Sequence, residues 1–202
     1  MARRSAADAA QTRADIIAAA RRLFADRGFA ATTTGEIAEA AGVTAGALFH
    51  HFEGKAALFR AVFECLELEL DGSVRASAGP DLGLEAFLAG FRAYLEFARR
   101  REFHRIVMVE GPAVLGEADW HAMDARRGAK TLMEGLEALV AEGVIEEQPL
   151  SPLGLLLLGA MSEAGFAVAR SRRRADVDEY VEALRYLLAP HLPAPAARRK
   201  RA

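Results

Sequence analysis

The chain has 202 residues, of which 52% are hydrophobic and 27% are charged, and its formal net charge is −2 at pH 7. This composition is sufficient for one globular domain or two small ones, and the ordinary charged fraction argues against intrinsic disorder. The single cysteine, Cys65, excludes an intramolecular disulfide. Because the net charge is slightly negative, the chain as a whole should have no strong nonspecific attraction for nucleic acid.

The sequence predicts neither a secretion signal nor a membrane-spanning helix. Residues 1–11 lack the apolar segment of a secretion signal, and the longest apolar run, residues 153–161, is far shorter than the ~20 residues of a membrane-spanning helix. We therefore expect a cytoplasmic protein without a membrane partner. The alanine-rich residues 1–11 should form a flexible basic arm, and residues 193–202 should form a disordered basic tail.

Residues 32–55 predict two short helices joined by a tight turn. Thr33 followed by Glu36 is a capping-box pattern, which marks the start of the first helix. Gly42 follows at the position where a left-handed residue would end this helix, and Thr44 is the expected N-cap of the second. A preceding helix should begin near Thr12 and end at Gly28.

The second short helix has two different faces. Leu48 and Phe52 fall together on one side, whereas Gly46, Ala47 and His50 fall on the other. Small residues allow a helix to bring its backbone and its positive N-terminal end close to a surface, as a recognition helix does in the DNA major groove. An ordinary helical hairpin would be the simpler interpretation if only the glycine turn were present.

The order of residues in this region resembles the DNA-binding signature of the TetR family of transcriptional regulators. The resemblance covers residues 12–63 and includes Phe24, Gly28, Phe29, Glu36, Ile37, Ala38, Ala41, Gly42, Val43, Gly46, Leu48, Phe49, His51, Phe52, Lys55 and Leu58. It implies a three-helix, helix-turn-helix DNA-binding domain. The residues expected to contact DNA are Thr33, Thr34, Thr44, Ala45, Gly46, Ala47, Phe49, His50, His51 and Lys55. Of these, Lys55 is expected to bind a phosphate.

Two positions depart from the family pattern. The family usually has tyrosine where this chain has Phe49, so a phenol that often donates to a phosphate is missing. Lysine or another larger residue is common where this chain has Ala45. Both changes preserve the fold, and both bear on operator affinity and sequence preference.

Beyond this region, the chain predicts only helices. A fourth helix should run from Lys55 to about Asp71, and the glycine- and serine-containing residues 72–83 are the best domain boundary. Helices are then expected over residues 84–97, 103–110, 120–142, 152–170 and 177–188. The predicted fold is all-α, with roughly nine helices, a DNA-binding domain over residues 12–71, and an effector-binding and dimerisation domain over residues 72–192.

The helix over residues 152–170 is apolar on nearly every side, so it must be buried on every side. A second copy of the chain could cover one face by forming a four-helix bundle with the last helix across a two-fold axis. The resemblance implies the same homodimer, and complete burial within one protomer is the alternative. The expected interface residues are Leu155, Leu156, Leu157, Ala160, Ala164, Val181, Leu184 and Leu188.

The second domain is also rich in aromatic residues and methionine, most of which should be ordinary core. A polar minority among them suggests an apolar pocket that orients a ligand. The candidate pocket residues are Phe87, Phe91, Tyr94, His104, Met108, Trp120, Met123, Glu163 and Phe166. Glu163 stands out because a carboxylate on so apolar a helix needs a partner or a ligand.

These features predict a ligand-responsive repressor that binds a palindromic operator as a dimer and is released by a small hydrophobic or amphipathic effector. The alternative is an all-helical protein-interaction module with a vestigial DNA reader. Enzyme motifs such as HExxH, GxxxxGK and GxSxG are absent from the sequence. Neither a cofactor nor a metal site is expected, because the adjacent His50 and His51 diverge on a helix.

Overall fold

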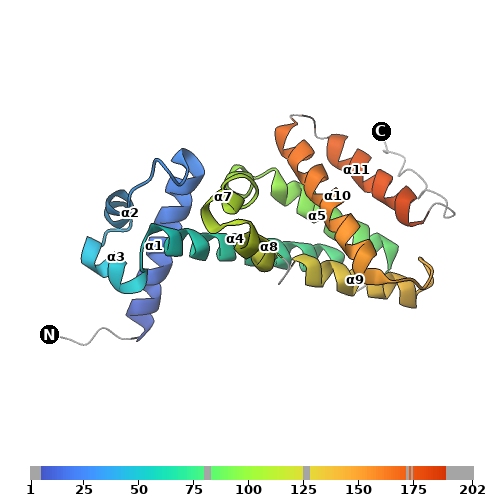
Figure 1. Ribbon diagram of the computed structural model, residues 1–202, viewed down its shortest axis with the longest axis horizontal. Helices are drawn as coiled ribbons and strands as arrows, with labels where there is room; N and C mark the ends of the chain where they lie inside the picture. Colours follow the sequence, from blue (N-terminus) through green and yellow to red (C-terminus); the bar gives the residue numbers. More distant parts are fainter. Residues whose placement is uncertain (1–5, 80–82, 125–127, 172, 174, 190–202) are drawn as a thin grey trace, which may run out of the picture.

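The computed structural model describes residues 6–79, 83–124, 128–171, 173 and 175–189. Within these ranges all regular structure is helical, which confirms the all-α class. A small N-terminal domain contains α1 (Ala6–Arg27), α2 (Thr34–Ala40) and α3 (Ala45–His51), and α4 (Lys55–Ala78) extends from it into a larger domain (Figure 1). The molecule is consequently elongated along α4.

The larger domain begins with α5 (Leu84–Ala98), which packs extensively against α4. It continues through α6 (Arg101–Phe103), the π-helix η1 (His104–Glu110), α7 (Gly111–Leu115), α8 (Glu117–Asp124), α9 (Lys130–Ala141), α10 (Leu150–Arg170) and α11 (Ala175–Leu188). The single helix expected over residues 120–142 includes residues 125–127, which lie outside the described ranges; its described parts are α8 up to Asp124 and α9 from Lys130.

The N-terminal boundary also differs from the prediction. Helix α1 starts at Ala6, so residues 6–11 are helical and do not belong to a flexible arm. Alanine has the highest helix propensity, which accounts for the early start. The hydroxyl of Thr12 donates to the Asp8 carbonyl at 2.8 Å inside the helix and does not cap it. Residues 1–5 and the predicted tail over residues 193–202 lie outside the described ranges.

The expected end of the fourth helix at about Asp71 is wrong, since α4 continues to Ala78 and is capped by Gly79, with φ +69°. The domain boundary expected at residues 72–83 stays a prediction. Gly72 lies on the exposed side of this helix, where a side chain would meet open space. A glycine inside a helix costs only about 1 kcal/mol relative to alanine, and the packing of α4 against α5 offsets that cost. Helix α4 therefore belongs to both domains.

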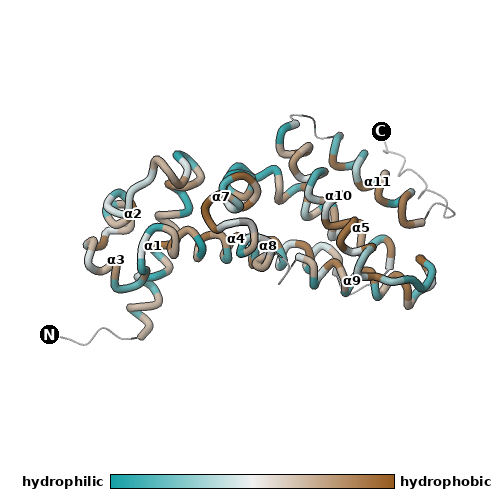
Figure 2. Tube along the Cα trace, viewed as in Figure 1, coloured by the Kyte–Doolittle hydropathy of each residue, from teal (hydrophilic) through white to brown (hydrophobic). Residues whose placement is uncertain are grey.

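Two hydrophobic clusters hold the molecule together. The first joins the DNA-binding region to the start of the larger domain, because Phe24 and Phe59 share it with Ile106 and Met108. The second lies among α5, α9, α10 and α11, where hydrophobic stretches of α5 and α10 meet (Figure 2). The joint between the two domains is thus part of a continuous core.

Helix α10 is the one helix in the described ranges that is long and apolar enough to cross a bilayer, and 28% of its most apolar window is buried. The expectation based on residues 153–161 overlooked the small apolar residues that extend this stretch. One face of α10 is packed in the second cluster through Leu157 and Val168. Length and composition alone are weak support for a membrane span when part of the helix is core.

Candidate nucleic-acid interface and ligand pocket

The start of α2 is fixed by the predicted capping box. The Thr33 hydroxyl oxygen accepts from the Glu36 N–H at 3.2 Å, and the Thr33 N–H donates to Glu36 Oε2 at 2.9 Å. These bonds from Thr33, together with the charge of Arg27, hold the pKa of the Glu36 carboxyl below its ordinary value. Helix α2 then ends before Gly42, whose φ of +67° is readily adopted by glycine.

Helix α3 has the expected buried and exposed faces. Thr44 caps it by accepting from the Ala47 N–H at 3.2 Å. Leu48 is fully buried against the N-terminal core, whereas Phe49 is 54% exposed. Gly46 and His50 are also exposed, on the side away from the core. The helix is therefore anchored by one face and free on the other.

Thr33 and Lys55, two of the residues expected to contact DNA, are engaged within the protein. Lys55 Nζ donates to the carbonyls of Phe29 at 2.8 Å and Thr32 at 2.9 Å, and it lies 4.3 Å from the centroid of the Phe29 ring. The Thr33 hydroxyl donates its hydrogen to Glu36 Oε2 at 2.9 Å. Lys55 thus holds the loop between α1 and α2 in place, and only one of its three N–H donors remains available for another partner such as a phosphate.

His50 and His51 lie next to each other in the last turn of α3. Their ring centroids are 5.5 Å apart with an interplanar angle of 69°, and no group of three metal-ligating side chains occurs in the described part of the chain. His50 is exposed and His51 is half-buried, so both remain candidates for hydrogen bonding to DNA.

A set of charged residues that the sequence did not predict connects η1 to the end of α1. Glu110 Oε2 accepts a hydrogen bond from the Phe29 N–H at 2.8 Å. Arg105 Nη1 donates to the Ala25 carbonyl at 3.2 Å and to the Asp26 carbonyl at 2.9 Å. These contacts satisfy backbone groups that the end of α1 leaves unpaired. They tie the loop before α2 to the larger domain.

Arg21 forms a second connection between the domains. Its guanidinium binds Glu69 of α4 and Glu102 of α6, with distances of 2.9 Å from Nη2 to Glu69 Oε2 and from Nε to Glu102 Oε2. The hydrogen bonds to Glu102 and Glu69 raise the pKa of Arg21, and the same interaction lowers the pKa of Glu102. Nothing in the spacing of these residues could have indicated their pairing.

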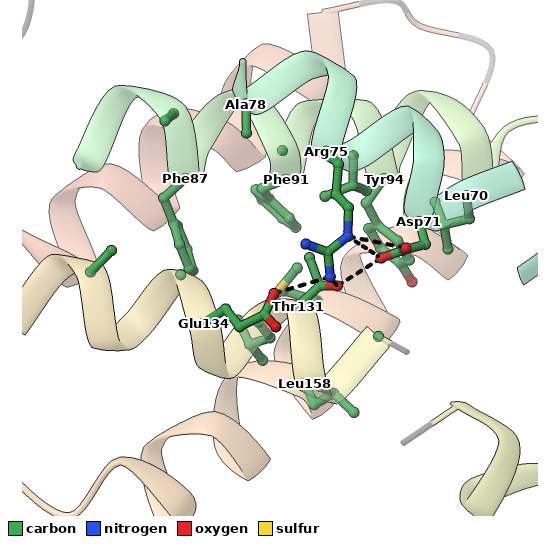
Figure 3. A pocket seen from close by; sticks show the side chains of 18 of the residues that line it. Leu70, Asp71, Arg75, Ala78, Phe87, Phe91, Tyr94, Thr131, Glu134 and Leu158 are labelled. Carbon is green, nitrogen blue, oxygen red and sulfur yellow. Dashed lines mark hydrogen bonds and ion pairs between the residues drawn. The ribbon is translucent and has the colours of Figure 1, made fainter. Parts of the chain in front are cut away.

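The larger domain contains a cavity of about 360 Å³ lined mainly by α4, α5, α9 and α10. Phe87, Phe91 and Tyr94, which the sequence predicted as pocket residues, all line it (Figure 3). Most of the remaining wall is apolar and includes Leu70, Val74, Ala86, Leu132, Ala138, Leu158 and Met161. The volume and lining are typical of a small-molecule site.

The other six predicted pocket residues do not line this cavity. Met108 and Met123 are buried in the first cluster. Trp120 packs against that cluster and donates from Nε1 to the Val107 carbonyl at 3.1 Å. The His104 ring lies edge-on to the Phe166 ring, with the ring centroids 6.2 Å apart. Burial is the main cause that lowers the pKa of His104, and the positive charge of Arg170 lowers it further.

The sixth, Glu163, is exposed to solvent, so it needs no buried partner. The sequence showed the chemical types of these side chains, but not which way each helix is rotated.

The polar side of the cavity comes from residues that the sequence analysis missed. Arg75 Nε donates to both oxygens of Asp71 at 3.1 Å. Its Nη2 donates to Thr131 Oγ1 at 2.9 Å and to Glu134 Oε2 at 3.0 Å, which links α4 to α9 (Figure 3). The only signal in the sequence was the i, i+4 spacing of Asp71 and Arg75.

The predicted dimer residues separate into two groups. Leu155 is 75% exposed, Leu156 is 73% exposed, and Ala160 is also exposed, as an interface requires. The others are buried within the protomer and leave little surface for a partner: Leu157, Ala164, Val181, Leu184 and Leu188. A helix that packs on its own domain turns half of its apolar residues inward.

Helix α11 adds two exposed residues that are not among the expected interface residues, Tyr186 and Leu187. Helices α10 and α11 lie side by side at one edge of the molecule (Figure 1). We call the exposed apolar residues of this pair the outer face: Leu155, Leu156, Gly159, Ala160, Tyr186 and Leu187.

Comparison with known families agrees with this arrangement. The family model described as "Bacterial regulatory proteins, tetR family" matches residues 16–62, and the model described as "Tetracyclin repressor-like, C-terminal domain" matches residues 84–190, more than half of the chain. The chain belongs to the TetR family. TetR-family proteins are DNA-binding transcriptional regulators, so this TetR-family chain is a regulator and not an enzyme.

The similarity to individual TetR-family relatives extends over nearly the whole chain. The transcriptional regulator AcrR of Shigella flexneri is 30% identical, over 97% of this chain and 99% of AcrR. TtgR of Pseudomonas putida is 48% identical over 81 residues, but that match spans only 40% of this chain and 39% of TtgR. The crystal structure of a TetR-family regulator from Pectobacterium atrosepticum has a TM-score of 0.75 at 34% identity, covering 95% of this chain and 100% of the other.

Proposed function

We propose that this protein is a dimeric cytoplasmic repressor that binds a palindromic operator and releases it when a small hydrophobic or amphipathic effector enters the cavity. The observation that carries the proposal is that α4 runs without a break from the core of the helix-turn-helix region, at Phe59, to the wall of the cavity, at Arg75. The match of residues 84–190 to a tetracyclin repressor-like domain supports repression as the direction of control.

The exposed face of α3 is the DNA reader in this proposal. Ala45, Gly46 and Ala47 have small side chains, so the helix can approach base edges closely with its N-terminal end. The Thr44 hydroxyl keeps a free hydrogen after it has capped the helix, and His50 is exposed in the last turn of α3. Thr34 and His51 remain the candidates for fixing the register on the DNA backbone.

The outer face of α10 and α11 is the proposed contact between two protomers. Leu155, Leu156 and Leu187 are each more than half exposed, so this apolar surface would face water in an isolated protomer. A two-fold axis through the face would bring α10 and α11 of both protomers together as a four-helix bundle. Two recognition helices about 34–36 Å apart could then read successive major grooves.

The proposed release mechanism uses both connections between the domains. A ligand that moves α4 at Leu70 or Arg75 would move the same helix at Phe59, in the core cluster that also contains Leu48 of the recognition helix. The bond from the Phe29 N–H to Glu110 would carry a shift of η1 to the loop before α2. The coupling need only be modest, because ~1–3 kcal/mol changes DNA affinity by ~5–150-fold.

Selection of binding sites from random duplex DNA tests the operator part of this proposal. The wild-type protein should enrich an inverted repeat and should bind it as two protomers. A variant with Leu155→Glu and Leu156→Glu is the matched control, because it should keep the reader and lose the preference for a second half-site. Enrichment of a single half-site bound by one wild-type protomer would contradict the proposed dimeric mode.

A further inference from the structure

Phe49 is the one phenylalanine of this chain whose side chain faces solvent. All eleven phenylalanines lie within the described ranges, and only Phe49, at 54%, is exposed. It belongs to neither hydrophobic cluster, although its neighbour Leu48 is fully buried in the first. A single exposed apolar side chain is common on protein surfaces, but this one lies on the face of α3 that is proposed to read DNA. Its ring offers a large apolar area to whatever that face contacts.

Ala45 extends the apolar surface of Phe49 by one helical turn. Residues four apart lie on the same side of a helix, so Ala45 and Phe49 form one row along α3. Gly46 and His50 form a second row beside it by the same spacing. All four residues are exposed. One row of the exposed face is therefore entirely apolar, and the other combines a glycine with one hydrogen-bonding ring.

The two helices of the helix-turn-helix lack the side chains that read base edges with paired hydrogen bonds. Those side chains are arginine or lysine for guanine and asparagine or glutamine for adenine, and neither α2 nor α3 contains any of them. Nearby, Lys55 donates to loop carbonyls, and Arg27 forms an ion pair with Glu36. Base recognition by α3 therefore depends on apolar contact and on hydrogen bonds from side chains such as Thr44 and His50.

We propose that Phe49 and Ala45 recognise thymine by contacting its 5-methyl group in the major groove. This inference rests on the proposed function only in taking the exposed face of α3 as the DNA reader. Among the four unmodified bases, thymine alone presents a methyl group at the major-groove edge, and alanine and phenylalanine side chains are suited to contact it. The proposal assigns a preference for thymine to a helix that has no arginine, lysine, asparagine or glutamine.

The DNA backbone is a poorer partner for Phe49 than a thymine methyl group. The ring has no polar hydrogen to donate to a phosphate oxygen, and covering a phosphate with an apolar ring would remove its water without replacing the hydrogen bonds. Contact with a deoxyribose would bury apolar area, but it would be the same for every base. A contact with the methyl group, in contrast, makes the affinity depend on thymine at one position.

Replacement of single thymines by deoxyuridine tests this contact, because uracil keeps every hydrogen-bonding group of thymine and lacks only the methyl group. The DNA is the duplex that the wild-type protein selects from random sequence, and the affinity of the full-length protein is measured by fluorescence anisotropy. At one or two thymines in each half-site, the replacement should lower affinity about two- to fourfold, as expected for the burial of one methyl group. Equal affinity for thymine and uracil at every position, or a selected site that requires no thymine, would overturn the proposal.

Two variants determine whether Phe49 makes the contact. Phe49→Ala truncates an exposed side chain, so it should fold, bind the thymine duplex more weakly and no longer distinguish it from the uracil duplex. Leu68→Ala is the matched control, because it removes an apolar side chain that is 57% exposed on α4, roughly 20 Å along that helix from Lys55. It should leave both affinities unchanged. If correctly folded Phe49→Ala still distinguishes thymine from uracil as the wild type does, Phe49 does not contact the methyl group.

The selected duplex also distinguishes this inference from the proposed function. A single half-site bound by one protomer would contradict the palindromic mode, and loss of affinity on thymine replacement in that half-site would still uphold the methyl contact. An inverted repeat that is bound by two protomers with equal affinity in its thymine and uracil forms would uphold the dimeric mode and reject the methyl contact. The absence of any preferred sequence would contradict both.

Discussion

The backbone N–H of Phe29 donates a 2.8 Å hydrogen bond to the side chain of Glu110, and this bond joins the DNA-binding region to the larger domain. Glu110 also lies 3.5 Å from Arg105, whose guanidinium binds the last carbonyls of α1. A Cβ on Gly28 would clash with Glu110, so glycine at this position permits the close approach. The geometry of the loop before α2 thus depends on a residue 81 positions away.

Replacing Glu110 should loosen this joint. In Glu110→Ala the Phe29 N–H loses its charged acceptor, and we expect a cost of about 1–3 kcal/mol in the free energy of local opening. Hydrogen exchange at the Phe29 amide measures that opening and should become faster. Glu110→Gln keeps an oxygen acceptor and should be affected less. Equal exchange rates in both variants and the wild type would show that the bond does not hold the loop.

Lys55 should contribute mainly to stability. Lys55→Ala removes two hydrogen bonds to the loop carbonyls of Phe29 and Thr32, together with the contact on the Phe29 ring. We expect the free energy of unfolding to fall by about 1–3 kcal/mol in denaturant titrations, whereas Lys55→Met should retain part of the packing. Unchanged stability, together with a flatter salt dependence of DNA binding, would instead restore the phosphate contact expected from the sequence.

Adjacent leucines on α10 should behave differently. Leu156→Glu places a charge on the outer face and should give folded monomers in analytical ultracentrifugation. Leu157→Ala removes a side chain that is only 2% exposed within the protomer, so it should cost about 2–5 kcal/mol of stability. If Leu156→Glu sediments like the wild type, α10 is not the dimer contact.

Lowering the pH should destabilise the protein partly through His104. Burial and Arg170 lower the pKa of His104 in the folded state, so between that value and about 6.5 the unfolded chain binds more protons. Stability should therefore fall as the pH drops below about 6.5, and His104→Gln should reduce that fall. Denaturant titrations at pH 7.5 and 5.5 measure it, and NMR titration of the ring should give a pKa below 6.5. A ring pKa above 6.5 would contradict this explanation.

The local elements were predictable because their causes are local. Thr33, Gly42 and Thr44 determine where α2 and α3 begin and end through bonds within a few residues, and each behaves as the sequence indicated. The buried position of Leu48 and the exposed position of Gly46 followed from helical spacing.

The sites that depend on helix packing were only partly predictable. Apolar periodicity identified α10 but could not distinguish Leu156, which faces outward, from Leu157, which packs inward. Likewise, Arg75 and Glu134 are 59 positions apart, and only the packing of α4 near α9 brings them together. Side chains that meet across helices leave no mark in the spacing of a single sequence.

The central claim is that the exposed face of α3 reads DNA. A Cβ at Gly46 would meet only Thr44 Oγ1, at an ordinary 4.0 Å, so Gly46→Glu should fold while it repels phosphates. Gly72→Glu makes the same charge change on the exposed side of α4, distant from α3. The most direct measurement is binding of both variants and the wild type to DNA from upstream of the gene, against scrambled DNA, at two salt concentrations. The wild type and Gly72→Glu should bind the upstream DNA preferentially and more weakly at high salt, and Gly46→Glu should lose at least tenfold in affinity. Equal binding by all three proteins would contradict the account.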